Sequence, residues 1–315
     1  MATINGVLGP IEPRDLGFTL MHEHILVANS AMRRCFPGYV DEEKLMRDAI
    51  REMGSLQQRG VRTIVDLTPI NLGRDIHVIR AVAEKTGMQV IAATGFYWTE
   101  EPWMDAWDAE VLAGYLIREI TDGIEGTDTR AGVLKCATDR LGVTPFNKKL
   151  LQATARAHRL TGVPISTHTA VFNQSGLHQQ DVFEECGVDL RRVVIGHCGD
   201  SKDLSYLESI LNRGSMIGMD RNGIDLILPT RERVATIAEL CRRGWADRMV
   251  LSHDASCFID WFPRPLVEKT LPDWHYRHVC DAVIPALRES GVGDEAIGKM
   301  TIENPRRFFE QQVPY

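Results

Sequence analysis

The feature that most constrains the fold is a series of eight apolar, β-rich runs, each followed by a stretch with helical spacing of apolar residues. The runs occupy residues 18–27, 61–69, 89–97, 131–138, 163–170, 192–200, 214–221 and 248–256. Intervening stretches such as 41–60 and 147–162 are amphipathic and end in a glycine that suits a helix C-terminus. This alternation predicts a parallel sheet covered by helices, either doubly wound or closed into a (β/α)8 barrel.

Polar residues at the strand ends favour the closed barrel, because only a barrel makes the first strand a neighbour of the eighth. Two further helical stretches, around residues 275–290 and 293–310, would complete or cap it. Barrels of this kind run to about 250 residues or more as one domain. We therefore predict that residues 1–315 form a single α/β domain, a (β/α)8 TIM barrel with short extra C-terminal helices.

Charge and hydropathy exclude several classes of partner. The chain has a formal net charge of −7 and no block rich in lysine or arginine, so no electrostatic footprint for nucleic acid or an anionic membrane is present. No apolar run approaches the length that crosses a bilayer. Seven scattered cysteines without a CxxC pair are typical of reduced thiols. We predict a cytoplasmic protein that acts on a small molecule.

The first run contains the segment His22-Glu23-His24. Residues i and i+2 of a strand project from the same face, so the two imidazoles would converge in a common metal-chelating geometry. Glu23 would point to the opposite, helix-covered face and need a buried hydrogen-bond partner there. By the same alternation, His253 should face away from the residue that follows it.

Three other polar residues end later strands. His168, His197 and Asp254 each lie at or just beyond the C-terminal end of a predicted strand, where functional residues of barrels collect. Each one alone could be a hydrogen-bonded core residue. Four histidines and an aspartate at one end of one layer predict a metal centre.

Lys135 lies within an apolar strand, where desolvation lowers its pKa toward a neutral amine. A neutral amine could form a Schiff base with a carbonyl substrate, as in barrel aldolases. Alternatively it could capture carbon dioxide as a carbamate, an anionic group able to bridge two divalent ions and offset part of their charge. The nearby histidines and aspartate favour the carbamate.

Five segments together carry a resemblance: HEH at 22–24, LKCAT around Lys135, THT around His168, GHCGD around His197 and SHD ending at Asp254. In order and context they resemble the phosphotriesterase family of the amidohydrolase superfamily, over nearly the whole chain. The resemblance implies a (β/α)8 barrel that acts as a homodimer with two divalent metal ions. Zinc is the expected metal, with iron, cobalt or manganese as the other candidates.

The resemblance also assigns ligands to each ion. It places His22, His24 and Asp254 on the more buried ion and His168 and His197 on the more exposed one, with carboxylated Lys135 as the bridge. A metal-bridging hydroxide would be the nucleophile in the implied reaction.

Within that family the chain is more similar to the phosphotriesterase-like lactonases than to the true organophosphate hydrolases. The stretch after the seventh strand is short and carries Arg221, whereas true phosphotriesterases have a histidine there and a longer insertion. Tyr97 matches a lactonase tyrosine beside the substrate carbonyl, and Phe258 and Trp261 match the loop that lines the acyl channel. These matches imply that Tyr97, Arg221, Phe258 and Trp261 contact substrate.

The implied activity opens acyl-homoserine lactones, a quorum-quenching reaction, or hydrophobic γ- and δ-lactones, with weak phosphotriesterase activity. Asp254 would accept the proton of the nucleophile, and Asp200 and Arg221 would orient Asp254. One departure is the acidic loop WTEEPWMDAWD at 98–108, which disfavours long acyl chains and phosphorylated sugar lactones.

Three alternatives stay open. The chain could be a dedicated organophosphate phosphotriesterase, since a P=O group can occupy the place of the C=O group. It could be a ligand-binding barrel that holds metals without significant turnover. A metal-free Schiff-base aldolase at Lys135 is the third. No GxSxG nucleophile elbow, P-loop or GxGxxG segment suggests another chemistry.

Overall fold

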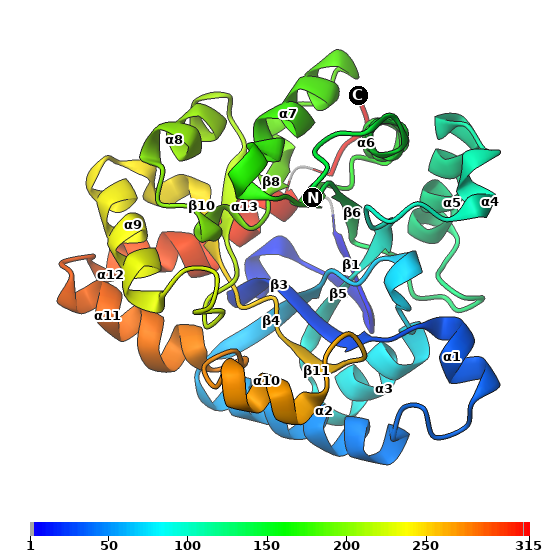
Figure 1. The fold of residues 1–315 in the computed structure, drawn as a ribbon, viewed down its shortest axis with the longest axis horizontal. Coiled ribbons are helices and arrows are strands. Elements are labelled where there is room, and N and C mark those ends of the chain that lie inside the picture. The colour runs from blue at the N-terminus through cyan, green and yellow to red at the C-terminus, as the bar shows by residue number, and fades with distance from the viewer. Residues whose placement is uncertain (1–2, 311) are drawn as a thin grey trace.

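The computed structural model describes residues 3–310 and 312–315 and contains a barrel of parallel strands inside a ring of helices (Figure 1). The strands of the barrel are β3 (Phe18–Val27), β4 (Val61–Asp66), β5 (Gln89–Gly95), β6 (Val133–Ala137), β7 (Ile165–His168), β8 (Val193–Ile195), β9 (Met216–Met219), β10 (Met249–Leu251) and β11 (Ser256–Ile259). Strands β3 to β10 each lie within one of the eight predicted runs. The predicted TIM-barrel fold is confirmed.

A helix follows each strand and covers the outside of the barrel. These helices are α2 (Glu42–Gln58), α3 (Ile76–Thr86), α5 (Ala109–Thr121), α6 (Pro145–Thr161), α7 (Ser175–Glu185), α8 (Leu204–Asn212), α9 (Thr230–Arg242) and α11 (Ile284–Glu289). Shorter helices α1 (Ser30–Cys35), α4 (Pro102–Asp105) and α10 (Arg264–Thr270) lie in the connections after β3, β5 and β11. The 3-10 turns η1 (Pro13–Asp15), η2 (Ile70–Leu72), η3 (Val171–Asn173), η4 (Leu190–Arg192), η5 (Cys198–Asp200) and η6 (Trp245–Arg248) lie in other connections.

Strands β10 and β11 are two parts of the eighth barrel strand, and they close the barrel. Strand β10 pairs with β9 on one side, whereas β11 pairs with β3 on the other. Between them the backbone N–H of Asp254 donates to His22 O over 3.0 Å, and His24 N–H donates to Ala255 O over 2.9 Å. Asp254 has a left-handed backbone with φ 56°. The first and eighth strands are therefore neighbours, as the closed barrel requires.

An apolar core fills the inside of the barrel and is closed at one end by the two ends of the chain. Met21, Val65, Ile91, Val133, Val194 and Val250 form this core with residues from both ends of the chain. The residues from the ends are Ile4 on β1 (Ile4–Gly6), Leu16, and Phe308 and Phe309 on α13 (Asn304–Glu310). Strand β1 pairs with β2 (Gly9–Ile11) in a hairpin that the sequence pattern does not predict. The polar residues lie at the opposite, C-terminal ends of the strands.

Both predicted C-terminal helical stretches are present. The first contains the π-helical segment η7 (Val279–Val283) and α11, and the second contains α12 (Asp294–Gly298), the π-helical segment η8 (Lys299–Glu303) and α13. All seven cysteines are free thiols. Across residues 3–310 and 312–315, we find no helix with the length and apolarity needed to span a bilayer.

Candidate metal centre

The barrel brings all the predicted metal ligands together at the C-terminal ends of its strands. His22 and His24 lie on β3, Lys135 on β6 and His168 at the end of β7, while His197 lies two residues beyond the end of β8 and Asp254 three residues beyond the end of β10. All six are largely buried, because the barrel wall surrounds them. They form two groups that meet at Asp254.

The first group contains both histidines of β3. The Nε2 atoms of His22 and His24 lie 3.3 Å and 2.9 Å from the same oxygen, Asp254 Oδ1. Lys135 Nζ lies 3.1 Å from His22 Nε2. His22, His24 and Asp254 converge closely enough to hold one cation.

The second group contains the histidines that end β7 and follow β8. His197 Nε2 lies 2.8 Å from His168 Nδ1 and 3.8 Å from Asp254 Oδ2. Asp254 therefore has one oxygen toward each group, a placement that would let it contact both ends of a two-ion site.

Hydrogen bonds behind three of the four rings fix which nitrogen of the imidazole carries the proton. His22 Nδ1 lies 2.8 Å from Asp220 Oδ2, and His197 Nδ1 lies 3.1 Å from Asp220 Oδ1. His168 Nε2 lies 3.2 Å from Asp139 Oδ2. A carboxylate only accepts, so these nitrogens donate and the opposite nitrogen of each ring keeps its lone pair.

Those lone pairs point into the centre and at one another. His197 Nε2 and His168 Nδ1 face each other over 2.8 Å without a proton between them, and His22 Nε2 faces a carboxylate oxygen. Burial lowers the pKa of His22 to about 4, with Lys135 adding to the effect, and lowers that of His197 well below its ordinary value, so both rings are neutral. Facing lone pairs repel unless a cation lies between them, so this donor set fits divalent metal ions.

Lys135 is almost completely buried, and burial lowers its pKa from its ordinary value to about 8. Gly95 on β5 lets the neighbouring strand approach it, since a Cβ added to Gly95 would overlap the main-chain oxygen of Lys135. The amine is therefore neutral in a larger fraction of molecules than an exposed lysine, as the sequence predicts.

An ion-pair chain supports Asp254 from the side away from His24. Arg221 Nε lies 2.9 Å from Asp254 Oδ2, and Arg221 Nη1 lies 3.0 Å from Asp200 Oδ2. Arg233, which the sequence does not single out, lies 2.8 Å from Asp200 Oδ1. Burial opposes ionisation of Asp254, but the surrounding histidines and Arg221 hold its pKa well below the ordinary value.

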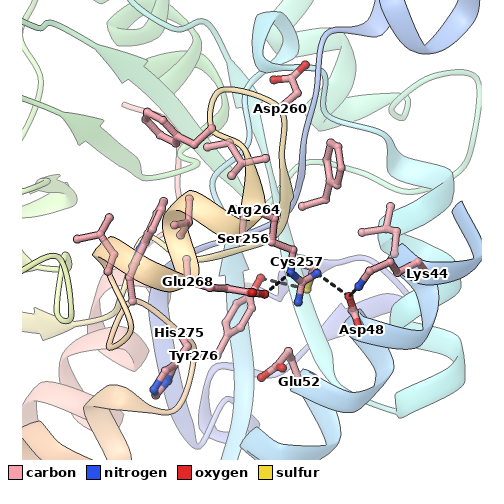
Figure 2. A pocket seen from close by; sticks show the side chains of 18 of the residues that line it. Lys44, Asp48, Glu52, Ser256, Cys257, Asp260, Arg264, Glu268, His275 and Tyr276 are labelled. Atoms are coloured by element: carbon pink, nitrogen blue, oxygen red, sulfur yellow. Dashed lines mark hydrogen bonds and ion pairs between the residues drawn. The ribbon is translucent and has the colours of Figure 1, made fainter. Parts of the chain in front are cut away.

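The predicted substrate-contacting residues lie in two places. The Tyr97 ring is centred 5.0 Å from the His168 ring and 5.7 Å from the ring of Trp261, so these aromatic residues border the metal centre. Phe258 lines a separate cavity of about 830 Å³ between α2, β11 and α10 (Figure 2). Among the described residues lining that cavity there is no predicted metal ligand.

This cavity nevertheless touches the backbone of the centre. Trp274, in its wall, donates from Nε1 to His253 O over 3.0 Å and to Asp254 O over 3.2 Å. The Tyr276 hydroxyl, also in the wall, donates to His24 O. The cavity thus lies outside the barrel wall where the first and eighth strands meet, and the candidate ligands lie on the inner side of that wall.

Asp220, Asp139 and Thr68 contact the histidines but are not predicted from the sequence. Thr68 Oγ1 lies 2.9 Å from His24 Nδ1, and Asp220 contacts two rings. Asp220 directly follows β9, so its position at a strand end was an available signal. The orientation of its carboxylate depends on packing that the sequence pattern does not specify.

The whole chain is similar to several known proteins. A model of the phosphotriesterase family matches residues 2–309. A phosphotriesterase homology protein of Mycobacterium tuberculosis is 47% identical over 100% of both chains, and an aryldialkylphosphatase of Saccharolobus solfataricus is 39% identical over 95% of this chain and 96% of its own. An N-acetyltaurine hydrolase of Xenopus tropicalis is 26% identical over 98% and 99%. A solved structure of the phosphotriesterase from Mycobacterium tuberculosis superimposes with a TM-score of 0.97 at 47% identity, over 100% of both chains.

Proposed function

The chain belongs to the phosphotriesterase family of hydrolases, and from this premise we propose that it is a metal-dependent lactonase. Its substrates would be acyl-homoserine lactones or hydrophobic γ- and δ-lactones, with weak phosphotriesterase activity. The observation that carries the proposal is the reach of Arg221, from the short connection after β9, to Asp254 Oδ2 at 2.9 Å. Tyr97 supports it from the other side of the centre, next to His168.

Two divalent ions, zinc first among the candidates, are part of the proposal. His22, His24 and Asp254 would hold one ion, His168 and His197 the other, and a Lys135 carbamate would join them. The facing lone pairs of the histidines and the lowered pKa of Lys135 support this assignment. When bound, such ions act as Lewis acids toward a carbonyl or phosphoryl oxygen and lower the pKa of water.

The side chains around the ions would carry out the proton and substrate handling. Asp254 is ionised and faces both groups, so it can accept a proton during attack and release it to the ring-oxygen leaving group. Arg221 holds the carboxylate in that orientation, because its guanidinium donates one hydrogen bond to Asp254 Oδ2 and a second to Asp200 Oδ2. Burial raises the pKa of Tyr97, so its hydroxyl keeps its proton and can donate to substrate.

The assembly of two chains is also a proposal. Trp261 and Phe262 after β11 and Leu266 on α10 are exposed, and Phe36 at the end of α1 is exposed as well. Exposed apolar side chains of this size occur at protein contact sites, and the adjacent rings of Trp261 and Phe262 support a homodimer. Light scattering of the purified protein tests this state directly.

Phosphotriester hydrolysis is the second candidate function. The relative from Saccharolobus solfataricus, at 39% identity, is an aryldialkylphosphatase by name. A pocket that orients a lactone carbonyl between Tyr97 and Asp254 could orient a phosphoryl oxygen in the same place.

Assays with one panel of substrates distinguish these candidate functions. Metal-reconstituted protein would be assayed with acyl-homoserine lactones of several chain lengths, simple γ- and δ-lactones, and paraoxon, using a pH indicator, beside chelated protein and an Asp254→Asn variant. Lactone turnover that exceeds paraoxon turnover by orders of magnitude and disappears in both controls supports the proposal. Paraoxon as the best substrate would reverse the order of the two functions. A protein that binds metal but turns over none of them would be a ligand-binding barrel.

A further inference from the structure

Asp220 contacts one histidine from each of the two groups of candidate ligands, and this double contact suggests a further role for it. Asp220 is about 1% exposed and directly follows β9. We propose that Asp220 is a positioning residue that fixes the tautomer of both His22 and His197, so that the affinity for both metal ions depends on one carboxylate. This inference rests on the proposed two-ion centre.

The two oxygens of Asp220 are divided between the groups. Oδ2 accepts from His22 Nδ1 over 2.8 Å, and Oδ1 accepts from His197 Nδ1 over 3.1 Å. Oδ1 also accepts the backbone N–H of His197 over 2.8 Å. The two bonds from the rings place the proton on Nδ1 and leave Nε2, which faces the centre, as a metal donor.

The backbone around Asp220 is built to receive its carboxylate. A Cβ added to Gly218 would overlap Asp220 Oδ2, and one added to Gly196 would lie 3.3 Å from the same oxygen. The backbone of His197 is left-handed, with φ 61°, and its N–H points to Oδ1. Gly218 and the left-handed backbone of His197 therefore leave room for this side chain, whereas a Cβ at Gly196 would first overlap the main-chain oxygen of Thr167.

The remaining histidines have partners of their own, which sets Asp220 apart. In the described part of the chain, His24 Nδ1 is paired with the neutral hydroxyl of Thr68, and His168 Nε2 with Asp139, whose side chain is 28% exposed. Asp139 contacts a single group, whereas Asp220 contacts both. A buried carboxylate hydrogen-bonded to neutral rings gains most when cations bind the far side of those rings.

Asp220→Asn tests the inference, with Asp139→Asn as the matched control. An asparagine supplies one acceptor oxygen, so one of the two rings must take the opposite tautomer, and the shared negative charge is lost from both. Zinc content after dialysis and zinc affinity by competition with a chelating indicator would be measured for each protein. We expect two ions per chain in the wild type, one site weakened about 10- to 100-fold in Asp139→Asn, and both weakened by that factor in Asp220→Asn.

A second measurement on the wild type does not depend on whether the variant folds. Nitrogen-15 spectra of zinc-loaded protein with labelled histidine should show His22 and His197 protonated at Nδ1 and His168 protonated at Nε2. Two unchanged zinc affinities in Asp220→Asn, loss of a single site, or the opposite tautomer at His22 or His197 would each overturn the inference. A wild type that binds no zinc would instead overturn the proposed centre.

Discussion

Glu23 and His253 lie against each other on the outer side of the barrel seam, with 2.6 Å between Glu23 Oε1 and His253 Nδ1. Each is the sequence neighbour of a residue of the metal centre, yet both point away from it, as strand alternation predicts. Glu23 also accepts the backbone N–H groups of His253 and Ala255, each over 3.0 Å. His253 Nε2 accepts the Val279 N–H over 2.8 Å and so ties this pair to η7.

Glu23→Gln should destabilise the fold by about 1–3 kcal/mol. The amide NH2 group would replace a carboxylate oxygen that accepts a backbone N–H in the wild type, so two donors would face each other. Urea unfolding of the metal-free protein measures this free energy without the contribution of bound ions. The exposed Glu289→Gln change is the control and should stay within about 0.5 kcal/mol of wild type. An unchanged free energy for Glu23→Gln would mean that Glu23 is protonated in the fold.

Lys135→Ala should lower metal-dependent turnover on the order of 100-fold or more, because it removes the proposed bridge. A short added carboxylate, such as acetate, should restore part of the activity. A Lys135→Arg protein with full activity would contradict the carbamate.

The carbamate also predicts a pH dependence. Burial lowers the pKa of Lys135 to about 8, so the reactive neutral amine is dominant above that pH and becomes scarce below it. At fixed dissolved carbon dioxide, reactivation of the metal-free protein by zinc should slow about tenfold for each pH unit below 8. Reactivation that ignores carbon dioxide at every pH would be the contrary result.

Arg221→Lys should lower kcat about 10- to 100-fold, because an ammonium cannot contact Asp254 and Asp200 with the two-pronged geometry of the guanidinium. Asp200→Asn acts through the same chain, so the double variant should lose less than the product of the two single losses. Steady-state kinetics on each protein, with its zinc content measured, tests this. A loss that simply follows loss of zinc would show that Arg221 supports metal binding instead.

Phe309→Ala should cost about 3–5 kcal/mol of unfolding free energy, because this buried ring closes the end of the barrel opposite the metal centre. The exposed Phe172→Ala change is the control, with an expected effect within about 0.5 kcal/mol. Zinc affinity of the folded Phe309→Ala protein should equal that of wild type. A weakened zinc affinity would mean that the floor of the barrel positions the ligands.

The strands can be predicted from the sequence because barrel strands are buried on both faces and therefore appear as short apolar runs with clear ends. Strand β3 matches residues 18–27 at both ends. The hairpin of β1 and β2 escaped prediction because strands of three residues show no measurable period. The division of the eighth strand depends on the left-handed backbone of Asp254, a conformation that its residue type alone does not specify.

The convergence of the candidate ligands follows from topology, since each lies toward the same end of a parallel strand. Asp220 gave the same signal, but its contacts depend on the room that Gly218 leaves for its carboxylate. The contact of Tyr97 with Trp261 joins loops far apart in the chain, and no local pattern fixes such a pairing. Phe258 lines the separate cavity and Trp261 does not, and no local sequence pattern specifies this difference either.

The contact between the first and eighth strands limits when, during synthesis, the residues of the candidate metal centre can come together. His24 and Asp254 are separated by 230 positions, so a ribosome adding about 5–20 residues per second completes the second tens of seconds after the first. In a growing chain the imidazoles of His22 and His24 are therefore present long before their carboxylate partner exists. Binding of the proposed metal ions in the final geometry would therefore have to follow synthesis of Asp254, and a chain truncated before Asp254 would lack that geometry.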